Sequence, residues 1–145
     1  MSSPGLLLAG RYRLESRIAV GGVGEVWRAE DLVLARPVAV KLLQEGYASH
    51  PQTLARFRAE ARHAGALTHP GIAQVYDYGE TGPAGAPYLV LELVDGPSLA
   101  GLLAAGPLDS AAAMDVIAQV AGMDFGAAQR FDRLGVIFVE HVRIP

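Results

Sequence analysis

Two stretches decide the fold: Ile18-Ala19-Val20-Gly21-Gly22-Val23-Gly24-Glu25-Val26-Trp27-Arg28-Ala29 and, a little further on, Pro37-Val38-Ala39-Val40-Lys41. A glycine cluster lies between two segments rich in β-branched and aromatic residues, and a third such segment ends on Lys41. Lys41 is the only lysine among twelve basic residues. The pattern predicts strand, glycine turn and strand, followed by a third strand that carries this lysine.

The glycine cluster has the composition of a phosphate-binding turn. Gly21, Gly22 and Gly24 allow the backbone N–H groups to approach a ligand closely, without a Cβ in the way. A dinucleotide-binding fingerprint needs a helix after its glycines, whereas Glu25-Val26-Trp27-Arg28-Ala29 is typical of a strand. The sequence also lacks the Gly-Lys-Ser/Thr of a Walker loop. A plain glycine hairpin with a solvent-exposed lysine remains the alternative at this point.

Alternation along the third strand places Ala39, Lys41 and Leu43 on one face and Val38, Val40 and Leu42 on the other. Lys41 lies two residues from Ala39, or about 6.6 Å along the strand. This spacing suits a flat ring beside the small Ala39 and phosphates beside Lys41.

A helix is predicted over residues 54–67, because apolar residues recur there about every 100°. Glu60 projects into this apolar stripe, while Arg58 and Arg62 face the opposite side. A carboxylate directed at an apolar interior is costly unless it is paired. Lys41 is the expected partner of Glu60. The alternative is that Glu60 lies at the margin of the stripe and reaches water.

Composition limits the class of protein. The length of 145 residues fits one domain, and a net charge of −3 argues against a nucleic-acid surface. With no cysteine there is no disulfide and no thiolate metal site, and a cytoplasmic location fits. No signal peptide and no membrane-spanning run is recognised. The four histidines have no ligand-like spacing.

The whole chain is predicted to be α+β, with a five-stranded antiparallel sheet, one main helix and a short helical C-terminal piece. The expected strands are 12–19, 24–30, 37–43, 72–78 and 88–94, with a loop over 79–87. The main helix has Pro51 in its first turn and is closed by His69-Pro70-Gly71. A short helix is expected over 98–104. Asp109 or Ser110 caps a further helix that carries Met114, Ile117, Val120 and Ala121 on one face.

Over residues 11–121 these features resemble the small lobe and the start of the large lobe of a bacterial Ser/Thr protein kinase. Arg11-Tyr12-Arg13-Leu14 resembles the entry to the first strand, Val38-Ala39-Val40-Lys41 the V-A-I-K strand, and Phe57-Arg58-Ala59-Glu60 the αC helix. His69-Pro70-Gly71-Ile72 and the segment Leu91-Glu92-Leu93-Val94-Asp95-Gly96 match the family's following segments in order. One departure is Ala19, which stands where the first loop glycine belongs.

The resemblance implies ATP and Mg²⁺ as cofactors. Lys41 would hold the α/β-phosphates and pair with Glu60, beneath the loop of Gly21, Gly22 and Gly24. The residues implied around the base are Leu91 as gatekeeper, the Glu92 carbonyl and Val94 amide as hinge contacts, and Ile18, Val26 and Ala39 as the roof. For each apolar residue, ordinary core packing is the alternative.

Four segments follow from this resemblance: a tail over 1–10, the ATP-binding lobe over 11–94, the hinge and first large-lobe helices over 95–121, and a divergent tail over 122–145. The sequence contains no His-Arg-Asp catalytic loop. Asp124-Phe125-Gly126 reproduces the magnesium-binding D-F-G motif, so Asp124 is a candidate metal ligand. Alternatively, residues 135–140 correspond to the approach to the catalytic loop, or the tail is unrelated sequence.

The sequence therefore predicts the ATP-binding portion of a Ser/Thr protein kinase that does not turn over alone, because the catalytic loop is missing. The alternative is a non-catalytic nucleotide-binding or docking module. A protein partner or self-association through the incomplete large lobe is expected in either case.

Overall fold

The protein is described by a computed structural model that covers residues 2–21, 24–48, 50–66, 72–81, 85–96 and 98–121. The chain divides into two compact units, Met1–Leu67 with Gln74–Leu93 and Thr68–Ala73 with Val94–Pro145. Gly22 and Asp124 lie outside the described residues, and Val94 belongs to the second unit. The other predicted site residues belong to the first.

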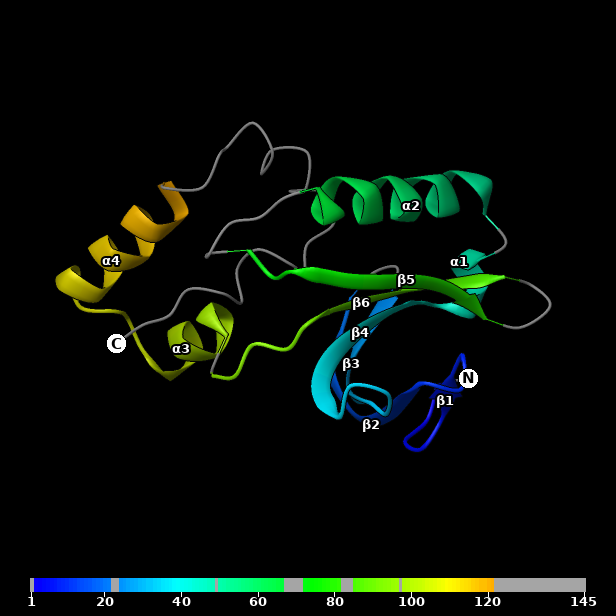
Figure 1. The fold of residues 1–145 in the computed structure, drawn as a ribbon. Coiled ribbons are helices and arrows are strands. Elements are labelled where there is room, and N and C mark those ends of the chain that lie inside the picture. Colours follow the sequence, from blue (N-terminus) through cyan, green and yellow to red (C-terminus); the bar gives the residue numbers. More distant parts are fainter. Residues whose placement is uncertain are drawn as a thin grey trace. The chain divides into compact units, whose positions relative to one another are not determined.

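The first unit is built on a six-stranded antiparallel sheet with the strand order β1-β2-β3-β4-β6-β5 (Figure 1). Its strands are β1 (Leu7–Leu8), β2 (Tyr12–Val20), β3 (Gly24–Asp31), β4 (Arg36–Leu43), β5 (Val75–Thr81) and β6 (Ala86–Glu92). The α+β class and the antiparallel sheet are as predicted.

The predicted count of five strands was wrong by one. The additional strand, β1, lies within the segment 1–10 that the sequence assigned to a tail. Leu7 pairs with Arg13 and Leu8 with Tyr12. A strand of two residues is too short to show the alternation on which a prediction depends.

The hairpin of β5 and β6 is longer than predicted, because pairing continues to Thr81 and Ala86 inside the expected loop 79–87. Gly79, which is typical of a turn, lies within β5 directly opposite Tyr88. A Cβ on Gly79 would come within 2.3 Å of the Tyr88 ring. This glycine therefore makes room for an aromatic ring, which sequence alone does not distinguish from a turn.

The two faces of the sheet have different roles. One face carries the largest apolar cluster: Leu8, Tyr12, Leu14, Trp27, Ala29, Val38, Val40, Leu42, Tyr88 and Val90. Ala39, Lys41 and Leu43 alternate with the β4 members of this cluster and so lie on the other face. Tyr88 to Leu91 are all buried, as predicted for a strand covered on both faces.

Helix α2 (Pro51–Gly65) lies alongside β5 (Figure 1). Pro51 occupies its first turn, as predicted, and a short helix, α1 (Glu45–Ala48), precedes it. Phe57, Glu60 and Ala64 are its buried residues. The helix ends at Gly65, earlier than the expected closure at His69. Residues 67–71 lie outside the described part of the chain.

The second unit contains α3 (Leu99–Ala105) and α4 (Ser110–Ala121). The Ser98 side chain accepts a hydrogen bond from Gly101 N, and Asp109 Oδ1 accepts one from Ala112 N, so both helices have side-chain caps. Met114 and Ile117 of α4 are exposed. Among the described residues, no helix combines the length and apolar character that a bilayer span requires.

Candidate functional site

The centre of the candidate site is a buried ion pair between β4 and α2. Lys41 Nζ donates to Glu60 Oε1 at 2.9 Å, and the two side chains are only 3% and 1% exposed. The sole lysine and the carboxylate predicted to pair with it are therefore in contact. The exposed alternatives, a solvent lysine and a Glu60 at the stripe margin, are excluded.

Strand register explains the position of Lys41. Lys41 is paired with Val26 on β3 and with Leu89 on β6, so a strand flanks it on each side. Its side chain shares a face with these two apolar neighbours. Nζ lies 5.9 Å from the centroid of the Phe57 ring, which comes from the same helix as Glu60. With apolar groups around it, the ammonium depends on Glu60 for its charge partner.

The glycine turn between β2 and β3 begins at the end of the same sheet. Gly21 N donates to the Gly24 carbonyl at 2.8 Å, closing the turn. A Cβ on Gly24 would lie 2.6 Å from the Leu42 carbonyl oxygen, so the close approach of β3 to β4 requires glycine here. Ala19, at the position of the missing first glycine, is paired with Val26 within the sheet.

Three of the residues predicted around a base lie on the Lys41 face. Val26 pairs with Lys41, and Ala39 pairs with Leu91, so their side chains share this face. All three are buried. Ile18 differs, because it is 46% exposed on β2. Their predicted contacts with a base remain predictions.

Glu92, at the start of the predicted hinge, forms hydrogen bonds with Gln74. Glu92 N donates to the Gln74 carbonyl at 2.8 Å, and the Glu92 carboxylate accepts from Gln74 N at 3.2 Å. Glu92 is thereby fixed as the last residue of β6. The predicted contacts of the Glu92 carbonyl and the Val94 amide with a base remain predictions.

The hydrogen bonds of Lys41 and Glu60 indicate that these residues can bind a nucleotide polyphosphate. Glu60 Oε2 is buried and accepts no hydrogen bond from a described residue, so Glu60 contacts Lys41 through Oε1 alone. The Lys41 ammonium has three donors, and among the described residues only Glu60 accepts a hydrogen bond from it. Beside it lies the apolar surface of Val26 and Ala39. A site of this kind can bind an anion joined to a flat apolar group.

A metal site is not formed by the described residues, which contain no group of three or more acidic or histidine side chains suited to a metal ion. Asp124, the predicted magnesium ligand, lies outside them. Magnesium binding therefore remains a prediction.

A second polar cluster near the site was missed. Arg58, two residues before Glu60, donates to Tyr78 Oη at 3.3 Å and to Glu80 Oε1 at 2.7 Å on β5. Tyr78 Oη also donates to Glu80 Oε1, at 2.9 Å. The sequence predicted only that Arg58 points away from the Glu60 stripe, and it assigned Glu80 to a loop, so it gave no signal that connects Arg58 with Glu80.

A third cluster lies at the far end of the sheet. Arg11 Nε and Nη2 each donate to a different oxygen of Asp31 at 2.8 Å, and Tyr12 Oη donates to Asp77 at 2.6 Å. Arg11 holds the pKa of the buried Asp31 carboxyl at about 2. Burial is the main reason why the pKa of the Tyr12 hydroxyl is raised. This cluster joins β2, β3 and β5 and has no contact that suggests chemistry.

The chain is similar to known serine/threonine-protein kinases. The chain is 49% identical over 119 residues to the serine/threonine-protein kinase PknA of Mycobacterium tuberculosis, an alignment that covers 79% of this chain and 28% of PknA. It is 46% identical over 114 residues to PknB of the same organism, covering 77% of this chain and 18% of PknB. No protein-family model matches the sequence.

Solved structures give the same result. The PknI kinase domain of M. tuberculosis superposes with a TM-score of 0.71 at 25% identity, over 93% of this chain and 52% of that domain. The chain is a partial protein kinase domain. The apo form of PpkA-294 shares the fold, with a TM-score of 0.60 at 23% identity over 72% of this chain.

This partial kinase domain spans 28% of the length of PknA, 18% of that of PknB and about half of the PknI kinase domain. β4 contains Val38–Lys41 and α2 contains Phe57–Glu60, the segments that resemble the V-A-I-K strand and the αC helix of the family. The Lys41–Glu60 pair therefore lies between the two elements expected to carry it.

Proposed function

We propose that this chain is the ATP-binding portion of a Ser/Thr protein kinase, and that its 145 residues alone bind the nucleotide without transferring phosphate. The observation that supports this best is the buried Lys41–Glu60 contact at 2.9 Å. Lys41 is a buried cation with the apolar neighbours Val26 and Leu89, and Glu60 fixes its position.

In this proposal the chain's own residues bind and orient the nucleotide. Lys41 Nζ provides the charge for the α/β-phosphates, and Glu60 keeps the ammonium from turning away. Gly21, Gly22 and Gly24 form the turn above the phosphates, in which the Gly21 N–H donates to the Gly24 carbonyl and so holds the turn closed. Ile18, Val26, Ala39 and Leu91 contact the base, with Glu92 and Val94 as its backbone partners. ATP supplies the phosphoryl group, and Mg²⁺ neutralises charge on its oxygens.

Turnover needs groups that these 145 residues lack. Catalysis of phosphoryl transfer depends on positioning and on charge stabilisation, with an aspartate that accepts the substrate hydroxyl proton. No His-Arg-Asp sequence is present, and Asp124, the predicted metal ligand, lies outside the described residues. We therefore propose nucleotide binding as the property of this chain and protein phosphorylation as that of the intact family.

Calorimetric titration with ATP tests the proposal. The informative variant is the double substitution Lys41→Met with Glu60→Leu, because it removes the phosphate-binding charge without leaving Glu60 buried and unpaired. We expect ATP affinity to fall about 10- to 100-fold, the value of a lost hydrogen bond to a charged group. Arg62→Ala, on the exposed side of the same helix, should bind like wild type. Equal affinity of the double variant and wild type would refute the assignment.

A phosphotransfer assay on the purified chain tests the second half of the proposal. No transfer to a protein substrate is expected, even with ATP and Mg²⁺ at saturation. Transfer that disappears with Lys41→Met would show that the chain is itself an active kinase.

A second candidate function, a non-catalytic docking module, is favoured by the α4 surface. Met114 and Ile117 are 63% and 58% exposed, although both are large and apolar. Such residues commonly mark a contact surface for a partner or a second copy. We expect a dimer or larger species in light scattering that dissociates when Met114 and Ile117 are both replaced by serine. A wild-type monomer at high concentration would contradict this function.

A further inference from the structure

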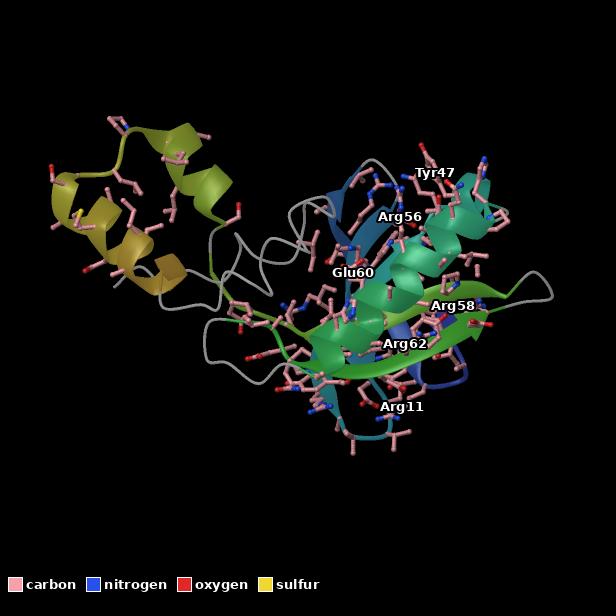
Figure 2. All side chains as sticks on the ribbon, turned by 90° about the horizontal axis from the view of Figure 1, so that it is seen from above. Arg11, Tyr47, Arg56, Arg58, Glu60 and Arg62 are labelled. Atoms are coloured by element: carbon pink, nitrogen blue, oxygen red, sulfur yellow. The ribbon has the colours of Figure 1, made fainter. Side chains whose placement is uncertain are left out.

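The Arg58–Glu80–Tyr78 cluster lies close in sequence to the Lys41–Glu60 pair but on the other side of helix α2. Figure 2 shows Arg58 and Arg62 on the side of α2 next to β5, and Glu60 on the opposite side. Residues 58 and 60 are two positions apart, or about 200° around the helix axis. The same helical turn is thus fastened at both sides, by Glu60 to β4 and by Arg58 to β5.

The β5 contact is made by several groups at once. Arg58 Nε and Nη2 both donate to Glu80 Oε1, at 3.2 and 2.7 Å, and Tyr78 Oη donates to the same oxygen at 2.9 Å. Tyr78 and Glu80 are two residues apart on one strand, so both side chains lie on one face of β5. The Arg58 hydrogen bond also lowers the pKa of the Glu80 carboxyl. Two side chains, from the helix and from the strand, therefore converge on one carboxylate oxygen.

The rest of the α2 attachment to the sheet involves few side chains. Besides Glu60, only Phe57 and Ala64 are buried among the helix residues that the structure describes. The contacts of Phe57 and Ala64 are apolar and therefore do not depend strongly on direction. An apolar contact tolerates rotation of the helix about its axis more readily than a hydrogen bond does. Rotation about that axis is the motion that would separate Glu60 Oε1 from Lys41 Nζ.

We propose that Arg58 is a positioning residue, which fixes the rotation of α2 on β5 through Glu80 and Tyr78 and so keeps Glu60 on Lys41. The importance of this contact for phosphate binding rests on the proposed function. The link between Arg58 and the Lys41–Glu60 pair can be tested without any nucleotide.

The composition of the chain provides a direct probe. Lys41 is the only lysine, so an amine-acylating reagent such as N-hydroxysuccinimidyl acetate reports on this side chain alone, apart from the chain's α-amino group. A buried, ion-paired ammonium reacts only when the structure opens locally and the amine loses its proton. The acylation rate of Lys41, measured by peptide mass spectrometry under native conditions, therefore reports how often Glu60 leaves it.

Arg58→Ala should raise the Lys41 acylation rate about two- to fivefold, the range that corresponds to a partly exposed ion pair. Alanine is the best helix former, so a faster rate would not come from a weakened helix. Arg62→Ala is the matched control, because Arg62 lies on the same side of α2 without an ion pair to any described residue, and it should leave the rate unchanged. The charge exchange Arg58→Glu with Glu80→Arg should restore the wild-type rate.

A variant that destabilises the sheet elsewhere separates positioning from general stability. Asp77 lies on β5, like Tyr78 and Glu80, and accepts a hydrogen bond from Tyr12 on β2. Asp77→Asn weakens this hydrogen bond and should lower the unfolding midpoint without accelerating Lys41 acylation. A wild-type rate in Arg58→Ala, an equal acceleration in Asp77→Asn, or failure of the charge exchange would each overturn the proposal. Since no ATP is present, a failure of ATP binding would leave these results unaffected.

Discussion

The Lys41 ammonium lies between the sheet and helix α2, and the side chains next to it are mostly apolar. A buried charge is tolerated when its partner is close, and removal of one partner costs far more than the pair contributes. Lys41 and Glu60 therefore depend on each other, which makes their energies strongly coupled.

We expect Glu60→Leu to lower the free energy of unfolding by about 3–5 kcal/mol, because it leaves the Lys41 ammonium buried without a partner. Adding Lys41→Met to Glu60→Leu should recover most of this loss, since two apolar side chains then replace the ion pair. Urea unfolding of the four members of this cycle measures the coupling. Single variants within about 0.5 kcal/mol of wild type, a change expected for surface positions, would contradict a buried pair.

The low pKa of Asp31 makes the free energy of unfolding depend on pH. Its carboxyl accepts hydrogen bonds from Arg11, Val33 N and Leu34 N, and its pKa falls from 3.8 to about 2, chiefly through Arg11. The unfolded chain binds more protons between these values, so the Asp31 contribution is present above about pH 4 and is lost as the pH falls to about 2.

Asp31→Asn should remove that contribution, so its unfolding free energy should vary less steeply between about pH 2 and 4 than that of wild type. The slope is the readout, because the substitution also weakens the Arg11 contact at every pH. Parallel curves for the two proteins would mean that Asp31 titrates normally in the folded state.

At the scale of the elements, the β5–β6 hairpin depends on a glycine under an aromatic ring. Gly79 faces Tyr88, whose ring packs edge-on against Tyr12 with centroids 6.1 Å apart. The Tyr88 ring is buried and cannot move freely away from a new methyl group.

Gly79→Ala should therefore cost about 1–3 kcal/mol through overpacking. Gly65→Ala is the matched control: Gly65 ends α2, has no neighbouring atom within 4 Å of the point where a Cβ would lie, and should be neutral or slightly stabilised by alanine. Thermal unfolding of both variants measures the difference. Equal midpoints would show that the Tyr88 ring does not lie over residue 79.

The elements also show how far the sequence determined the site. Alternation in 37–43 and the helical stripe in 54–67 favoured a contact between Lys41 and Glu60, because both signals extend over many residues, and left a solvent-exposed lysine and a Glu60 at the stripe margin as alternatives. The structure shows the contact. Leu7 and Leu8 carry no such signal, so β1 was missed. Gly79 was interpreted as a turn residue because a glycine required by a neighbouring ring and a glycine required by a turn look identical in sequence.

The contacts of Arg58 could not be predicted either, because the sequence signals did not include its partners. The apolar periodicity of a helix identifies its buried face and predicts that the opposite face is exposed to solvent. The partners Tyr78 and Glu80 come from a strand that was predicted to end at Tyr78 and that continues to Thr81. Without the register of β5, nothing connected residue 58 with residue 80.

At the scale of the whole molecule, the chain is a partial kinase domain in two compact units, and the first of these carries nearly all the proposed nucleotide contacts. A complete ion pair within this unit supports binding by the unit itself. Because ATP binds only the folded form in this account, it should stabilise the protein increasingly as its concentration rises above Kd.

Acylation of Lys41 in the presence of ATP tests the central claim most directly. ATP at about 100 times its Kd should slow the modification of Lys41 about 100-fold, because the amine is covered by phosphate and the opened form does not bind. The α-amino group of the same chain should react at an unchanged rate, which provides an internal control. If millimolar ATP leaves the acylation of Lys41 as fast as before, the Lys41–Glu60 pair does not hold a nucleotide and the proposed function is wrong.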